Sequence, residues 1–234
     1  MPPPSDRLVR FDRAVRRVHR TTACLMLTCL ATAGCLYLPP LAQLVGNRRV
    51  VVTLHLWSGI ALPLPFVCGL ALRAVRADAA RLSRFGPADR AWLRAVRRRL
   101  PERPAGKFNA GQKLYAQWTL GAVLVMLGTG LLMTATGLAP LAWRTGATFV
   151  HDWGATAVAA AVVAHVLKAL RDPEARKGMR TGTVDARWAA REHPLWRGTV
   201  ATSTSTSTST STSPGAIADG ARPGGTRRRP RPHP

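Results

Sequence analysis

The sequence predicts an all-α integral membrane protein with a bundle of four transmembrane helices, and two observations support this fold class. Four stretches contain no Asp, Glu, Lys or Arg, namely residues 21–47, 50–72, 114–143 and 153–167. The first three exceed the roughly 18 apolar residues typical of a membrane span, and the fourth becomes long enough when it is extended back to residue 145. We therefore expect helices at about 21–38, 50–72, 114–138 and 145–170, in preference to a soluble helical core.

The second observation is the placement of the basic residues, which give the chain a net charge of +23. Six arginines precede the first predicted helix, twelve Lys or Arg lie between the second and third, and thirteen follow from Lys168 onward. Only three occupy the other two loops. By the positive-inside rule, both termini and the long loop 73–113 are cytoplasmic. We assign this charge to topology and contact with anionic lipids, and expect no nucleic-acid partner.

The first predicted helix follows a basic cytoplasmic segment at residues 1–20. A signal peptide is the alternative interpretation, because a small-residue triplet, Ala31 to Ala33, could mark a cleavage site. The apolar run continues beyond this triplet toward Pro39 and Pro40, which favours a spanning helix. Residues 21–170 are therefore taken as one membrane domain that includes all four predicted helices.

Two further segments lie outside the predicted spans. Residues 87–100 indicate a short amphipathic helix at the cytoplasmic interface, with Trp92 and Leu93 on one side and arginines largely opposite. Residues 171–200 are expected to form a cytoplasmic extension, in which His193 is interpreted as an ordinary surface histidine. Residues 201–234, a Thr-Ser repeat followed by a Pro- and Arg-rich tail, are expected to be disordered.

Four of the six histidines lie in or at the ends of the predicted helices, where ionisable side chains are costly and usually functional. His151 and His165 share one helix, 14 residues apart, which puts them on nearly the same face and about 21 Å apart. The predicted topology places His55 level with His151 near the outer surface, and His19 level with His165 near the inner one. Two facing neutral imidazoles can supply both axial ligands of a haem iron. A proton relay is the alternative, but it would normally recruit carboxylates, and Asp152 is the only candidate.

Several motifs in a fixed order carry a resemblance to a known family. They are RFDRAVRRVHR, HLWSG, KFNAGQK, HDWGA with a second histidine fourteen residues on, and GTVDARWAAREHPLW. Together they resemble the cytochrome b (gamma) subunit of respiratory formate dehydrogenases, within the di-haem cytochrome b561-like family, over residues 9–197. The most specific matches are KFNAGQK and the terminal W-A-x-x-x-H-P-x-W.

This resemblance implies a subunit that holds two haems b in the plasma membrane of a bacterium. His55 and His151 would bind the iron of the outer haem, and His19 and His165 that of the inner haem. Asn109 and Gln112 of the KFNAGQK motif, together with His165, would form a quinone pocket. Arg16, Arg20 and Lys168 could neutralise haem propionates, or could simply extend to the membrane surface.

The resemblance also implies partners. An iron–sulfur (beta) subunit would deliver electrons at the outer face from a molybdenum-type catalytic (alpha) subunit, and menaquinone or another quinone would accept them. We find no catalytic residue for a substrate dehydrogenase in this chain, and a higher oligomer of the complex is left open. The alternatives are a cytochrome b subunit of a hydrogenase or sulfur-compound reductase, a stand-alone membrane cytochrome b reductase, and a haem-free scaffold or transporter.

Overall fold

The computed structural model describes residues 7–196, and the tail predicted to be disordered lies outside the described residues. The elements in chain order are β1 (Arg7–Val9), α1 (Arg13–Tyr37), α2 (Pro39–Val45), α3 (Arg48–Ala61), α4 (Leu64–Gly69), α5 (Arg73–Ser83), α6 (Pro87–Arg97), α7 (Ala110–Thr134), α8 (Leu141–Leu170), α9 (Pro173–Thr181), β2 (Thr183–Asp185) and α10 (Ala186–Glu192).

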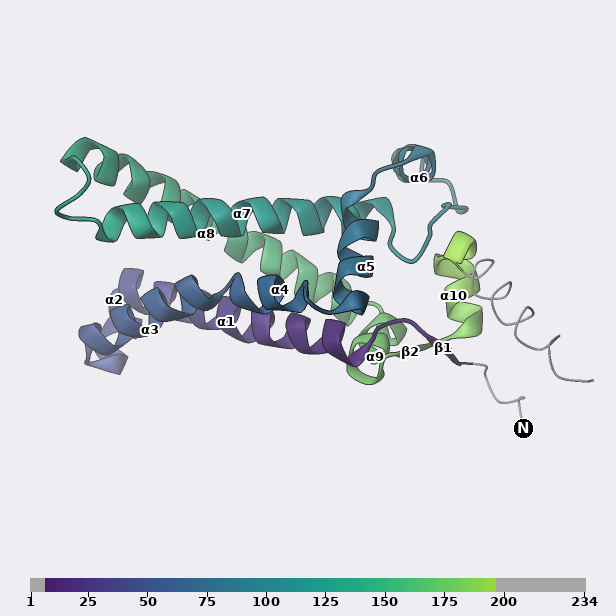
Figure 1. Ribbon diagram of the computed structural model, residues 1–234, viewed down its shortest axis with the longest axis horizontal. Coiled ribbons are helices and arrows are strands. Elements are labelled where there is room, and N and C mark those ends of the chain that lie inside the picture. The colour runs from purple at the N-terminus through teal and green to yellow at the C-terminus, as the bar shows by residue number, and fades with distance from the viewer. Residues whose placement is uncertain (1–6, 197–234) are drawn as a thin grey trace, which may run out of the picture. The chain divides into compact units, whose positions relative to one another are not determined.

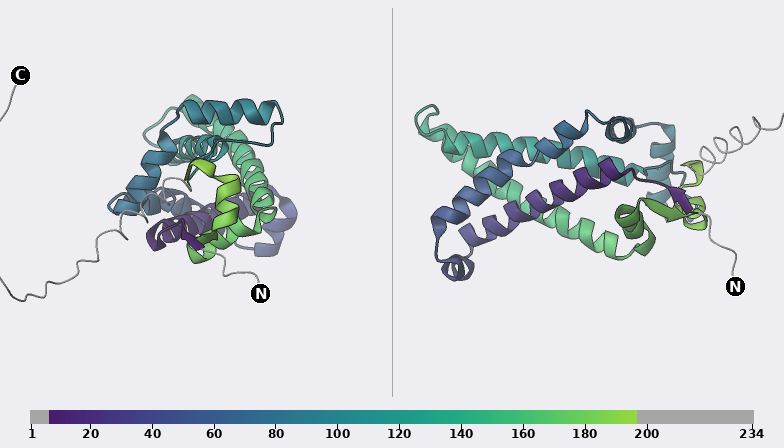
Figure 2. Two further views of the ribbon diagram at one scale, coloured as in Figure 1. Left: turned by 90° about the vertical axis from the view of Figure 1, so that its right-hand side faces the viewer. Right: turned by 60° about the horizontal axis from the view of Figure 1, so that its bottom comes forward.

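The long helices form two hairpins (Figure 1). In the first, α1 packs mainly against α3, with further contacts to α2 and α4, and in the second, α7 packs mainly against α8. Contacts of α3 with α7 and of α1 with α8 join the two hairpins. The right-hand view of Figure 2 shows α8 crossing the first hairpin at an angle, so one helix faces both α1 and α3 along its length.

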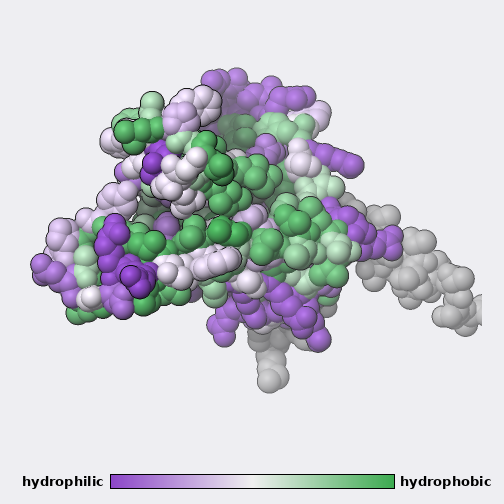
Figure 3. Space-filling model, turned by 60° about the vertical axis from the view of Figure 1, so that its left-hand side comes forward, coloured by the Kyte–Doolittle hydropathy of each residue, from purple (hydrophilic) through white to green (hydrophobic). Residues whose placement is uncertain are grey.

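Three helical segments within the described residues are long and apolar enough to span a membrane: α3 with α4 (Arg48–Gly69), α7 and α8. A fourth is counted only if α1 and α2, which are bent by 105°, are taken as one span. Many large apolar side chains on these helices are exposed. In Figure 3, hydrophobic residues form a broad area with hydrophilic residues at its margins, as expected for a surface that contacts lipid.

Helix boundaries differ from the predicted ones for local reasons. The Asp12 side chain accepts a hydrogen bond from Ala14 N, so α1 begins at Arg13 and includes basic residues assigned above to a separate N-terminal segment. The predicted helix at 50–72 is divided into α3 and α4, because Pro63 and Pro65 lack the N–H that an uninterrupted helix needs. Helix α7 begins at Ala110 because Asn109 caps it.

The loop between the second and third spans is more ordered than its composition indicates. It contains α6, which corresponds to the predicted amphipathic helix, and also α5, which was not predicted. The two lysines of the KFNAGQK motif anchor these helices. Lys107 Nζ lies 2.6 Å from Asp78 of α5, and Lys113 Nζ lies 2.8 Å from Asp89 of α6. Both carboxylates are buried, so these ion pairs fix α5 and α6 against the start of α7.

The N-terminal strand β1 pairs antiparallel with β2, which follows α9. Gly182 lies between α9 and β2 with φ of 93°, a left-handed conformation that favours glycine. Its carbonyl accepts hydrogen bonds from the backbone N–H groups of Arg10 and Phe11. A Cβ at this position would lie 2.7 Å from the Phe11 carbonyl oxygen, so only glycine lets this turn lie against the segment that precedes α1.

Replacing Gly182 with alanine should therefore destabilise the protein by about 1–3 kcal/mol, through backbone strain and the clash with Phe11. Thermal unfolding in detergent measures this. Gly106→Ala is the matched control, because a Cβ there meets no atom within 4 Å and the backbone is not left-handed. Equal unfolding midpoints for the two variants would contradict the role of Gly182.

Candidate functional site

Two histidine pairs lie between the hairpins. The α2-end pair consists of His55 on α3 and His151 on α8, whose ring centres are 6.2 Å apart with planes inclined at 72°. The α9-end pair consists of His19 on α1 and His165 on α8, at 6.4 Å and 62°. The structure thus brings together the pairs that the sequence predicts, and the uninterrupted helix α8 contributes one histidine to each.

The two pairs have different surroundings. In the α2-end pair, Nδ1 of His55 lies 2.9 Å from Thr32 Oγ1 and Nδ1 of His151 lies 3.0 Å from Thr129 Oγ1. In the α9-end pair, the His165 ring stacks on Tyr115 at 5.2 Å, with an interplanar angle of 8°. The side chains of the α2-end pair are half-buried, whereas those of the α9-end pair are exposed.

The ring separations fit two axial ligands of one metal. A metal–imidazole nitrogen bond is about 2.0 Å long and a ring nitrogen lies about 1.1 Å from its ring centre, so two imidazoles on opposite sides of a metal have centres about 6.2 Å apart. The observed 6.2 and 6.4 Å agree with this geometry. The donor set also suits haem iron, for which neutral imidazole is a common axial ligand. Open space around Gly59, one turn after His55, leaves room for a flat ring.

Comparison with known proteins identifies the family. The family model described as prokaryotic cytochrome b561 matches residues 10–182, well over half of the chain. The chain belongs to the prokaryotic cytochrome b561 family. It is a multi-pass membrane cytochrome b, and the family implies haem b as its cofactor. All four paired histidines lie within the matched residues, and His193 lies beyond them.

Relatives with a named function match part of the chain. Over 94 residues it is 30% identical to the cytochrome b556(Fdn) subunit of nitrate-inducible formate dehydrogenase from Escherichia coli (strain K12). The corresponding subunits of Escherichia coli O157:H7 and Shigella flexneri match to the same extent. The alignment covers 39% of this chain and 43% of each relative, so the chain matches less than half the length of these proteins.

The predicted quinone contacts Asn109 and Gln112 have a structural role. Asn109 Oδ1 accepts from the Gln112 backbone N–H at 2.9 Å, and Gln112 Oε1 accepts from the Asn109 backbone N–H at 3.0 Å. This reciprocal pair is a capping box, which satisfies two N–H groups at the start of α7. Each side-chain oxygen thereby holds one cap hydrogen bond, and the two amide NH₂ groups have no hydrogen-bond partner among the described residues.

Two of the predicted propionate partners are bound to α9. Arg16 Nη1 and Arg20 Nη2 both donate to the carbonyl oxygen of Arg180, at 2.6 and 3.1 Å. This carbonyl lies in the last turn of α9, where cations are favourable. Arg16 Nε is buried and has no hydrogen-bond partner among the described residues. Arg16 Nε faces Gly182, because a Cβ built on that glycine would lie 3.2 Å from it, so the contacts of Arg16 give no support to a role at the α9-end pair.

The prediction for His193 was wrong, because this histidine is 2% exposed. Its Nδ1 lies 2.6 Å from the carbonyl oxygen of Gly106, which can only accept, so Nδ1 carries the hydrogen. Its Nε2 therefore accepts a hydrogen bond from Arg10 Nη2 at 2.9 Å. The Arg10 guanidinium also lies 4.8 Å from the Trp188 ring and 5.8 Å from the Trp196 ring. The terminal W-A-x-x-x-H-P-x-W motif thus encloses Arg10 and joins three distant segments of the chain.

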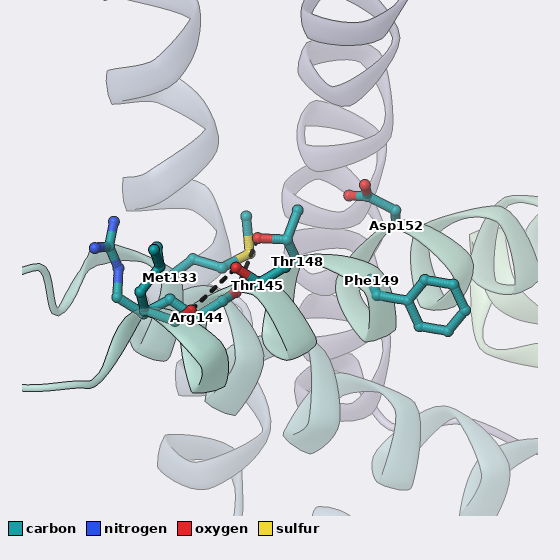
Figure 4. Close-up of a pocket in the computed structure, with 7 residues that line it drawn as sticks. Met133, Arg144, Thr145, Thr148, Phe149 and Asp152 are labelled. Carbon is teal, nitrogen blue, oxygen red and sulfur yellow. Dashed lines mark hydrogen bonds between the residues drawn. The ribbon is translucent and has the colours of Figure 1, made fainter.

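A pocket of about 560 Å³ opens where α7 ends and α8 begins (Figure 4). Arg144 and Asp152 lie on opposite sides of it. Asp152 accepts a hydrogen bond from the Tyr37 hydroxyl, which ties the end of α1 to α8. The pocket contains none of the four paired histidines, so it provides no support for a cofactor site.

The sequence analysis missed three contacts of the paired histidines: those of Thr32, Thr129 and Tyr115. A signal for the threonines was present, because each precedes its histidine by a similar interval, 23 residues for His55 and 22 for His151. Tyr115 could have been noticed as an aromatic residue two positions after the KFNAGQK motif. Neither the Thr–His interval nor the position of Tyr115 identifies a contact by itself, because the sequence does not show which helices pack together.

The burial of His193 leads to a pH-dependent stability. Burial, and then the nearby Arg10 cation, lower the pKa of His193 from 6.5 to about 4. Since the unfolded chain binds this proton at a higher pH than the native one, the contribution is fully present above pH 6.5 and is lost as the pH falls toward 4. The loss amounts to about 3 kcal/mol.

Unfolding of the wild-type chain and of His193→Gln between pH 7 and 4 tests this expectation. Glutamine can still accept from Arg10 but does not titrate, so the variant should lose less stability over this range. The same slope in both proteins would show that the pKa of His193 does not differ between the native and unfolded states.

Proposed function

We propose that the chain is the membrane-anchoring di-haem cytochrome b subunit of a formate dehydrogenase-type complex. It receives electrons from an iron–sulfur subunit at the outer face and delivers them to menaquinone or another quinone near the cytoplasmic face. Four spans, with α1 as the first, form a domain at residues 21–170. Both termini, the loop containing α5 and α6, and the extension at 171–200 are cytoplasmic.

The observation that carries this proposal is the pair of ring separations, one at each end of α8. His55 and His151 hold one haem, and His19 and His165 hold the other. When bound, each haem supplies a one-electron carrier. The surrounding helices fix the four imidazoles, and Tyr115 holds the plane of the His165 ring by stacking on it. The two sites are about 21 Å apart along α8, given the helical rise.

This direction of transfer conserves energy. Moving an electron inward, against a membrane potential that is negative inside, requires about 2.3 kcal/mol per 100 mV. The protons for quinol come from the cytoplasm. Formate oxidation itself belongs to a partner, because we assign no substrate-dehydrogenase site to this chain. The partial match to a formate dehydrogenase subunit supports an iron–sulfur subunit and a molybdenum-type catalytic subunit as partners.

A hydrogenase-type or sulfur-compound reductase complex and a stand-alone cytochrome b reductase are the alternatives. Purification of the tagged chain from intact membranes distinguishes them. Recovery of an iron–sulfur subunit and a large molybdenum subunit with formate-dependent haem reduction would support the proposal. A chain purified without partners from membranes that oxidise formate would favour the stand-alone reductase.

Replacing single histidines tests the two sites. His55→Ala or His151→Ala should reduce the haem content from two per chain to one and spare the α9-end site. His165→Ala should remove the other haem together with quinone reduction. Haem content and the dithionite-reduced spectrum of the purified protein measure these losses.

The control for these variants is His193→Gln, since His193 belongs to neither pair and both haems should remain. Quinone reduction that persisted in His165→Ala would show that the pairing is wrong. A wild-type spectrum without b-type bands would exclude haem binding altogether.

The quinone pocket is proposed at Asn109, Gln112 and His165, with the two amide NH₂ groups as donors. Asn109→Ser and Gln112→Glu keep an oxygen for the capping box but remove the NH₂ group. Both haems and the unfolding midpoint should be unchanged, while electron transfer to quinone slows at least about tenfold, as expected for the loss of about 1.4 kcal/mol of binding. Asn109→Ala, which also removes the cap, is the comparison. Normal quinone reduction in the first two variants would show that these residues are helix caps only.

A further inference from the structure

The two histidines of the α2-end pair are held in the same way. Thr32 of α1 contacts His55 of α3, and Thr129 of α7 contacts His151 of α8. In each hairpin the threonine lies on the first long helix and the histidine on the helix that packs against it. The arrangement therefore occurs twice, once in each hairpin, and both copies converge on one pair.

The hydrogen-bond directions follow from the other contacts of each threonine. The Thr32 hydroxyl lies 2.7 Å from the carbonyl oxygen of Thr28, and the Thr129 hydroxyl lies 2.7 Å from that of Val125. A hydroxyl has one hydrogen, and a carbonyl can only accept, so each hydroxyl donates to its own helix. Its oxygen is then an acceptor, and the histidine Nδ1 must be the donor.

An independent contact supports this assignment for His55. Its Nδ1 also lies 3.2 Å from the carbonyl oxygen of Cys29, a second group that can only accept. Nδ1 therefore carries the hydrogen, and Nε2 keeps the lone pair that a metal can bind. Thr32 is only 8% exposed, and its backbone hydrogen bond restricts its rotamer, so the acceptor is rigid.

The α9-end pair has no such partner. Within residues 7–196, neither the His19 ring nor the His165 ring makes a hydrogen bond to a protein group, and His165 is held by stacking on Tyr115 instead. The two ends of α8 thus present chemically different imidazoles. An N–H that donates to a fixed acceptor makes the opposite ring nitrogen a stronger metal ligand.

We infer that Thr32 and Thr129 are positioning residues that hold His55 and His151 as Nδ1–H tautomers, with Nε2 free to bind metal. This inference rests on the proposed haem ligation by that pair. A stronger donor stabilises the oxidised metal more than the reduced metal, so the threonines lower the reduction potential at the α2 end. A lower potential at that end favours transfer toward the α9 end, which is the direction of the proposed electron path.

The test uses Thr32→Val and Thr129→Val in the full-length haem-loaded protein, since valine keeps the shape and removes the hydroxyl. Redox titration should resolve two components in the wild type, of which one shifts to a higher midpoint potential in each variant. Haem affinity at that site should fall about 10- to 100-fold. The other component should not move.

Three controls separate this role from a general packing effect. Thr28→Val and Thr119→Val each remove a hydroxyl that donates to a backbone carbonyl of its own helix, Cys24 O and Tyr115 O, and that makes no hydrogen bond to His55 or His151. Thr32→Ser keeps the acceptor and should retain the wild-type potential. If Thr32→Val and Thr129→Val had the same midpoint potentials as Thr28→Val, the inference about the threonines would be wrong, while the proposed haem ligation would stand. A wild-type chain that binds no haem would instead overturn the proposed function, and this inference with it.

Discussion

The positions of the two histidine pairs depend on one constraint: helix α8 runs without a break through the apolar region. Its 30 residues carry His151 and His165, and the helical repeat puts both on one face. Each then meets a histidine from the other hairpin, His55 on α3 and His19 on α1. A kink in α8 would separate at least one pair, because the interval between the two histidines is set only by the helix. The second span tolerates a break at Pro63, since it carries a single paired histidine.

Ion pairs and one buried arginine outside the predicted spans hold α5 and α6 against the start of α7 and join the segment before α1 to the segment after α10. Lys107 and Lys113 bind buried carboxylates of α5 and α6, and these buried pairs are costly to separate once formed. Arg10 connects the N-terminal segment to His193 and to the Lys107 carbonyl oxygen, at 3.0 Å. Burial lowers the pKa of Arg10 to about 10, so it remains a cation at neutral pH. Residues of the KFNAGQK motif and of the terminal W-A-x-x-x-H-P-x-W motif therefore make the contacts that hold these segments together.

The spans formed by α3 with α4, by α7 and by α8 could be predicted from sequence, as could the proximity of the paired histidines, because runs without charge and the asymmetry of Lys and Arg are strong local signals. The surroundings of His193 could not, since Arg10 lies 183 residues away and no local pattern reports such a contact. Helix α5 was missed because its many charged residues resemble a loop when its packing against α7 is unknown. Asn109 and Gln112 were predicted as quinone contacts from a resemblance, and the same amide chemistry that would bind a ligand also caps a helix.

The two ends of α8 hold their imidazoles in different ways, which bears on the proposed path for electrons. At the α2 end, both imidazoles donate to threonines whose own hydrogens are committed to their helices, so the ring orientation is fixed by directional bonds. At the α9 end, the rings are more exposed, one is held only by aromatic stacking, and arginines lie nearby on α1. Stacking on Tyr115 restrains the plane of the His165 ring but provides no acceptor for a ring N–H. The α2 end is therefore the more rigidly held of the two, which suits the proposed role of that pair as an electron relay and of the α9 end as the side of the proposed quinone pocket.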